Sequence, residues 1–166
     1  MSRQILLLLL ICMLFSSTAY SNLVETVRLI KPSVVGIGVY TPTGRPKNQL
    51  YGSGFVIGDG SYVVTNSHVI AKELDESLLQ KMAVFVGSGK NAKVREAEIV
   101  ATSSLYDLAI LKISGSALPA MNLASERLYA DGSYIAFTGF PIGGVLGLYP
   151  VTHRGMIASI TPTVVP

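Results

Sequence analysis

The chain alternates between short apolar segments and turns rich in glycine, proline and asparagine, and this alternation is the feature that most constrains its fold. The segments cover residues 33–40, 50–57, 62–65, 83–86, 94–101, 108–113 and 134–138. An Asp-Gly pair at 59–60 lies between two of these segments and is typical of a β-hairpin. Many short strands divided by turns predict an all-β protein, either a barrel or a sandwich.

A short helix is predicted ahead of the first strand. Residues 22–30 place Leu23, Val27 and Ile30 at helical spacing, which gives the segment one apolar face. Pro32 follows and ends the predicted helix, because proline has no N–H to donate. We therefore expect one amphipathic helix at the start of a β-rich chain.

Two other regions complete the assignment. Residues 71–80 are polar and predict an inserted loop with partial helical character. Residues 146–152 and 155–161 are two further β-rich runs, and they predict a hairpin that closes the chain. The chain shows no repeat, no low-complexity tract and no clear linker, so residues 22–166 are predicted to form one domain of ordinary size.

The first 21 residues have the pattern of an export signal. Arg3 supplies a positive charge, residues 5–15 are an unbroken apolar run, and residues 16–21 are mostly small and polar. The alternative is an uncleaved membrane anchor, but the apolar run is shorter than the ~20 residues that span a bilayer. We therefore expect cleavage near Asn22, no stable membrane span afterwards, and a periplasmic or extracellular location.

Composition narrows the classes of protein that this chain can represent. The single cysteine, Cys12, lies inside the predicted signal, so the mature chain has no internal disulfide and depends on an ordinary hydrophobic core. The net charge is only +3, and the basic residues are scattered along the sequence. A nucleic-acid partner is therefore not expected.

Two polar residues at strand ends suggest a functional site. His68 is one of two histidines and follows a strand within VVTNSHVI, residues 63–70. Asp107 begins the apolar run DLAILKI, which predicts a strand buried on both faces, where a carboxylate needs a polar partner. A carboxylate bonded to one imidazole nitrogen makes histidine a general base. The alternatives are a buried His68 bonded to a turn carbonyl and an Asp107 that accepts backbone N–H groups as a strand cap.

Four stretches of the sequence resemble one family. GSGFVIGDGSYVVTNSHVI (52–70), YDLAILKI (106–113), IAFTGFPIG and VTHRGMIASI (both within 135–160) are similar to trypsin-like serine proteases of the high-temperature-requirement (HtrA) type. The similarity runs from about residue 23 to the end. It implies that His68 is the general base and Asp107 its orienting partner. It also implies that residues 52–54 form the wall facing that histidine.

The resemblance also implies a fold and a reaction. The fold is an antiparallel β-barrel of the trypsin/chymotrypsin type, with a complete first barrel at about 33–113 and a truncated second barrel at about 134–161. The reaction is peptide-bond hydrolysis through an acyl-enzyme, in a cleft between the barrels, on exported and unfolded polypeptides. No metal or organic cofactor is implied.

The sequence departs from the family at the nucleophile. Members of the family carry a G-x-S-G-G segment after the second barrel begins, and none occurs in these 166 residues. The GSG tripeptides at 52–54 and 87–89 precede Asp107, which is the wrong order, and Ser114 and Ser116 lack a second-barrel frame. We therefore expect a fragment that hydrolyses peptides poorly and, through open strand edges, associates into a homo-oligomer. The alternatives are a naturally truncated relative that binds peptides or partner proteases, and a structural β-domain unrelated to proteolysis.

Two remaining motifs predict no ligand. His153 has no cysteine or second histidine near it in sequence, so a metal site is not expected, and we predict an exposed hairpin residue. The glycine-rich turn at 139–144 lacks the Lys-Ser/Thr pair of a phosphate-binding loop.

Overall fold

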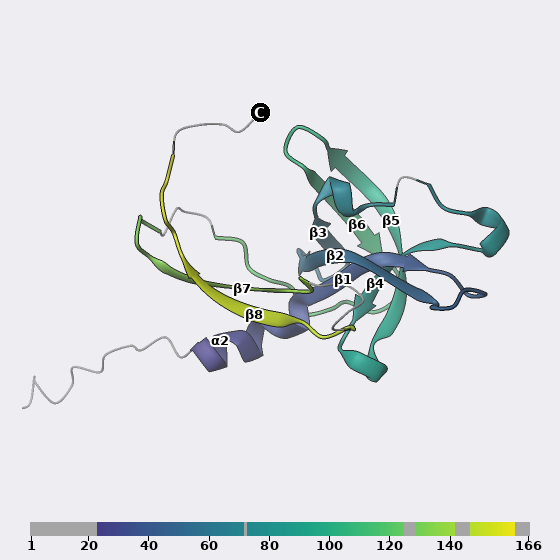
Figure 1. Cartoon of the computed structure of the whole chain (residues 1–166), viewed down its shortest axis with the longest axis horizontal. Coiled ribbons are helices and arrows are strands. Elements are labelled where there is room, and N and C mark those ends of the chain that lie inside the picture. The colour runs from purple at the N-terminus through teal and green to yellow at the C-terminus, as the bar shows by residue number, and fades with distance from the viewer. Residues whose placement is uncertain (1–22, 72, 125–128, 142–146, 162–166) are drawn as a thin grey trace, which may run out of the picture.

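The computed structural model describes residues 23–71, 73–124, 129–141 and 147–161. The predicted signal peptide at 1–21 lies outside the described residues. The described part begins with a short helix, continues into a six-stranded barrel, and then forms a small two-stranded sheet beside that barrel (Figure 1).

The barrel contains six antiparallel strands in the order β1-β2-β3-β6-β5-β4, and β4 pairs with β1 to close it. The strands are β1 (Val34–Tyr40), β2 (Asn48–Ile57), β3 (Tyr62–Thr65), β4 (Lys81–Val86), β5 (Lys93–Ser103) and β6 (Leu108–Ile113). All six lie at segments that the sequence predicted as strands. The prediction of an all-β fold is confirmed.

The barrel interior is built from aliphatic side chains. The side chains with no exposed surface include those of Val35, Ile37, Val56, Val63, Val84 and Leu111. They belong to five of the six strands, so closing the barrel removes one face of each of these five from water. Burial of this apolar surface is the main stabilising contribution in a chain that has no disulfide.

Strand β6 corrects one prediction. Ala109, Leu111 and Ile113 point into the core, but Leu108 is 47% exposed and Lys112 is exposed. The strand is therefore buried on one face and not on both. The run is apolar on both faces because Leu108, on the outer face, is also apolar. Leu108 lines a hollow of about 340 Å³ that Ala136 of the second sheet also lines.

The second sheet pairs β7 (Tyr134–Gly139) with β8 (Val151–Met156). The predicted closing hairpin, 146–152 paired with 155–161, is wrong, because one continuous strand runs through the polar residues expected to form its turn. His153, one of those turn residues, fits a strand because it stacks on its cross-strand partner Phe137, and next to it Thr152 bonds Thr138 at 2.8 Å.

The helix α2 (Leu23–Ile30) matches its prediction. Leu23, Val27 and Ile30 are half-buried, whereas the rest of the helix is exposed. A 3₁₀ turn, Lys31–Ser33, contains Pro32 and leads into β1. No helix among the described residues is both long and apolar enough to cross a membrane.

Two loop regions lie next to the barrel. Residues 73–80 of the predicted insertion form a loop with one 3₁₀ turn, Glu76–Leu78, capped by the Asp75 carboxylate. After β6 the chain crosses the β2–β3 hairpin, where the Leu118 N–H donates to Gly60 O at 2.9 Å and the Met121 N–H donates to Val56 O at 2.8 Å. This crossing brings β7 into contact with β1 and β2.

Candidate active site

The register of β3 and β6 brings His68 and Asp107 together. The two strands are antiparallel, and Thr65, the last residue of β3, pairs with Ala109 near the start of β6. The residues that follow Thr65 therefore lie beside the residues that precede Ala109. The Ser67 N–H donates to the Asp107 carbonyl at 3.2 Å, which extends the contact past the end of the ladder.

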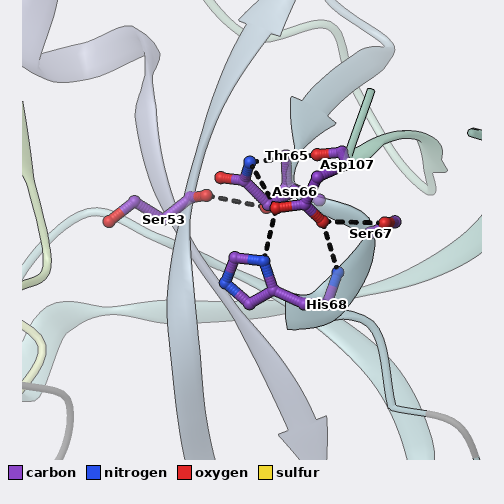
Figure 2. Close-up of polar contacts among 6 residues, drawn as sticks. All are labelled: Ser53, Thr65, Asn66, Ser67, His68 and Asp107. Atoms are coloured by element: carbon purple, nitrogen blue, oxygen red, sulfur yellow. Dashed lines mark hydrogen bonds and ion pairs between the residues drawn. The ribbon is translucent and has the colours of Figure 1, made fainter. Parts of the chain in front are cut away.

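His68 lies in a single 3₁₀ turn, Ser67–Val69, directly after the strand. Its Nδ1 is 2.6 Å from Asp107 Oδ2, and its backbone N–H donates to Asp107 Oδ1 at 3.0 Å (Figure 2). The His68 side chain is 70% exposed and that of Asp107 is 42% exposed. The alternative of a buried histidine bonded to a turn carbonyl is therefore wrong.

Asn66 and Ser67 complete the shell of donors around Asp107. The Ser67 hydroxyl donates to Oδ1 at 2.8 Å, and Asn66 Nδ2 donates to Oδ2 at 3.2 Å and to the Asp107 carbonyl at 3.0 Å. The sequence analysis assigned these two residues no role. Their signal was available, because Asn and Ser side chains next to a strand end commonly bond nearby polar groups.

These donors keep the Asp107 carboxylate ionised. The backbone N–H of His68, then the Ser67 hydroxyl and then the His68 imidazole lower the pKa of Asp107 from 3.8 to about 2. Asp107 thus accepts backbone and side-chain N–H groups at once, so the strand-cap and histidine-partner interpretations hold together. Its backbone φ of 49° lies in the left-handed region, which aspartate tolerates better than most residues.

Strand β2 passes close to the turn that carries His68. A Cβ added at Gly52 would lie 2.8 Å from Val69 Cγ2, so the backbone of β2 packs directly against that turn. The Thr65 hydroxyl donates to the Ser53 carbonyl at 2.8 Å, and the Phe140 N–H donates to Ser53 Oγ at 2.7 Å. Sequence reasoning did not find these links, because they depend on the packing of two sheets.

The other residues considered from sequence lie elsewhere. Ser114 and Ser116 follow the last residue of β6, whereas Asp107 precedes the first, so the length of the strand separates them. The Arg95 guanidinium donates to the carbonyls of both serines. His153 is exposed, as predicted, but it lies within β8 with its ring centroid 5.3 Å from that of Phe137.

The geometry supports acid–base chemistry at an imidazole. With Nδ1 bonded to a carboxylate, the ring is held in the tautomer that leaves Nε2 free to accept a proton. No group of three or more His, Cys, Asp or Glu side chains suited to a metal ion occurs in the part of the chain that the structure describes.

Comparison with known proteins identifies the family. Residues 52–165 match the trypsin-like peptidase domain. The chain belongs to the trypsin-like peptidase family. Its relatives include a probable periplasmic serine endoprotease, DegP-like, of Halomonas elongata, which is 34% identical over 112 residues, 68% of this chain and 21% of the relative. A protein of the same description from Pseudomonas fluorescens is 34% identical over 95 residues, 57% of this chain and 18% of the relative.

A solved structure agrees with this assignment to the trypsin-like family. The crystal structure of the serine endoprotease from Yersinia pestis superposes with a TM-score of 0.64 at 27% identity, covering 84% of this chain and 45% of that one. The predicted resemblance to HtrA-type trypsin-like proteases is therefore confirmed, as is the fold class of a closed antiparallel barrel followed by a second, smaller sheet. The chain spans about a fifth of the length of the curated relatives that it matches.

Proposed function

We propose that this chain carries the general base and the orienting carboxylate of a serine endopeptidase. The observation that supports this most directly is the 2.6 Å contact between His68 Nδ1 and Asp107 Oδ2 in a trypsin-like peptidase domain. His68 Nε2 takes the proton of an attacking serine and returns it to the leaving amine. Asp107 holds the imidazole and stabilises its charged form.

The 166 residues do not supply the attacking serine in the expected motif. They contain no G-x-S-G-G segment, which in the family provides both the nucleophile and the backbone donors for the oxyanion. We therefore treat the chain as a fragment of the catalytic unit that is weakly active or inactive alone, because triad members act together.

The substrates that we propose are exported polypeptides in unfolded form. Residues 1–21 would direct export, and residues 22–166 would form the peptidase domain. The relatives described as periplasmic support this location, as does the charged, apolar and small-residue order of the first 21 residues. We propose the periplasm or the extracellular space as its place of action.

A non-catalytic relative that binds peptides or partner proteases is the second candidate. The observation that favours it is the exposed apolar surface of the second sheet, where Ile135 is 42% exposed and Phe137 is 57% exposed. Such a surface is typical of contact with another polypeptide.

The deciding experiment uses the protein encoded by the complete gene. The locus is sequenced past codon 166, and the encoded protein is tested for cleavage of labelled unfolded casein and for labelling by a serine-directed fluorophosphonate. His68→Ala should lower the cleavage rate by about 10⁴-fold or more, and His153→Ala should leave it unchanged. An encoded protein without a reactive serine, or one that cleaves equally well as His68→Ala, would overturn the proposal and favour the binding candidate.

A further inference from the structure

Ser53 accepts two hydrogen bonds, each from a different segment of the chain. Its carbonyl accepts the hydroxyl of Thr65, the last residue of β3, and its own hydroxyl accepts the N–H of Phe140, the first residue after β7. The two distances are 2.8 Å and 2.7 Å. Ser53 thus links the second sheet to the strand that precedes His68.

Both partners of Ser53 are buried. Thr65 and Phe140 are each 4% exposed, so water has little access to replace either bond. Thr65 is only three residues from His68 and is held against β6 by its pairing with Ala109. A shift of Thr65 would therefore move the turn carrying His68 relative to Asp107.

The packing around the Ser53 hydroxyl depends on a glycine. A Cβ added at Gly139 would lie 2.7 Å from Ser53 Oγ and 3.3 Å from Ser53 Cβ. The backbone of Gly139 does not have a positive φ, so space and not conformation calls for glycine there. The absence of a side chain at residue 139 lets the Ser53 hydroxyl stay on the Phe140 N–H.

We propose that Ser53 is a positioning residue for the His68–Asp107 pair, linking the start of the β7–β8 connection to the end of β3. Its hydroxyl points away from the His68 imidazole (Figure 2), so Ser53 acts through backbone and Thr65 and not on the reacting atoms. The role as positioning residue rests on the proposed function, in which His68 is the base.

The test measures the chemical reactivity of His68 in the 166-residue chain. The chain has two histidines, so acylation by diethyl pyrocarbonate is followed at each by mass spectrometry of its own peptide, normalised to added N-acetylhistidine. His68 is largely exposed, so its rate reports the nucleophilicity of Nε2, which the pairing with Asp107 raises. Asp107→Asn gives the rate of an unpaired His68. Amide exchange of residues 66–69 is measured in parallel.

Three variants and one matched control separate positioning from general damage. Ser53→Ala removes the acceptor, Gly139→Ala forces the hydroxyl off the Phe140 N–H, and the double variant restores space for the residue 139 methyl. Ser133→Ala is the control, because the Ser133 hydroxyl also accepts a backbone N–H, that of Ala130 at 3.0 Å.

Ser53→Ala and Gly139→Ala should each slow acylation of His68 toward the Asp107→Asn rate and speed amide exchange at residues 66–69. The double variant should be no slower than Gly139→Ala, because the two changes act on one contact. Ser133→Ala should match the wild type. Wild-type rates in both single variants, with Asp107→Asn slowed, would overturn the role of Ser53 alone. Equal slowing at both histidines, with lost cooperative unfolding, would also overturn it. A wild-type rate in Asp107→Asn would instead contradict the proposed function.

Discussion

Thr65 and Ala109 are cross-strand partners, and their pairing sets the geometry of the site. The two residues lie at the end of β3 and near the start of β6, so the polar residues just beyond the ladder meet each other. His68 and Asp107 are 39 positions apart in sequence, and the pairing of β3 with β6 brings them together. The register of β3 against β6 therefore forms the His68–Asp107 pair, and a change that shifts this register would separate the two side chains.

Acid should remove the stabilisation that Asp107 contributes. The pKa of Asp107 is lowered to about 2 in the folded protein from 3.8, so the unfolded chain takes up a proton first as the pH falls. The contribution is complete above about pH 4 and is lost as the pH falls through about 2. Thermal unfolding of wild type and Asp107→Asn between these limits should show a difference in melting temperature that shrinks with acid. A constant difference would contradict the prediction. Asp59 and Asp75, whose pKa values are also lowered, are present in both proteins and cancel.

Ser67→Ala should raise the pKa of Asp107 from about 2 toward 3.8, because the Ser67 hydroxyl is the second largest cause of its lowering. Carboxyl carbon chemical shifts followed by NMR through an acid titration measure this directly. Ser61→Ala is the matched control, since that hydroxyl bonds Asp59 instead. In the protein encoded by the complete gene, Ser67→Ala should reduce cleavage less than His68→Ala does. An unchanged titration of Asp107 would show that the Ser67 bond does not stabilise the carboxylate.

Gly38→Ala should destabilise the barrel. The register of β1 against β2 changes between Ile37 and Gly38. A Cβ at Gly38 would lie 1.9 Å from the Gln49 carbonyl oxygen. Relief requires the two strands to separate, so we expect a loss of about 1–3 kcal/mol or more in the free energy of unfolding. Urea denaturation measures it. Gly155→Ala is the control, because a Cβ at Gly155 would lie 3.8 Å from its nearest neighbour, Ile135 Cγ1. Equal losses in both variants would refute the steric argument.

Leu111→Ala tests whether the barrel core carries the stability of the chain. Leu111 has no exposed surface and lies among the aliphatic side chains of the core cluster. Truncation leaves a cavity in a closed barrel and should cost about 2–5 kcal/mol in the free energy of unfolding. Leu105→Ala, at a side chain that is 78% exposed, should change it by less than about 0.5 kcal/mol. Similar values for both variants in urea denaturation would contradict this assignment of the core.

The sequence predicted the parts of the fold that are encoded locally. Strand β6 was predicted to the residue, and α2 to within one residue of its start, because an apolar run and Pro32 mark their limits. The pairing of His68 with Asp107 was implied by the family resemblance, whereas the residues alone indicated only that a carboxylate at the start of an apolar strand needs a polar partner. The pairing was right although β6 is buried on only one face.

The parts that failed depend on which strands are neighbours. The second half of the predicted C-terminal hairpin does not form, since the partner of β8 is β7 and no local pattern shows this. The links from Ser53 to Thr65 and Phe140 join three separate segments, so no spacing in the sequence reveals them. Sequence therefore predicted the pair itself better than the residues that hold it in place.

The second sheet should cause the chain to self-associate. Ile135 and Phe137 alternate along β7 with Ala136 and Thr138, which line the hollow against the barrel, and are themselves 42% and 57% exposed. Among the described residues the β7–β8 sheet has two strands, and an exposed apolar face beside unpaired strand edges favours contact with a second copy. Sedimentation velocity should show the average mass rising with concentration, and Phe137→Ser should shift this rise to higher concentration. The matched control is Leu105→Ser, since Leu105 is equally apolar and lies outside this sheet. A monodisperse monomer at all concentrations, or equal effects of the two variants, would contradict association through this face.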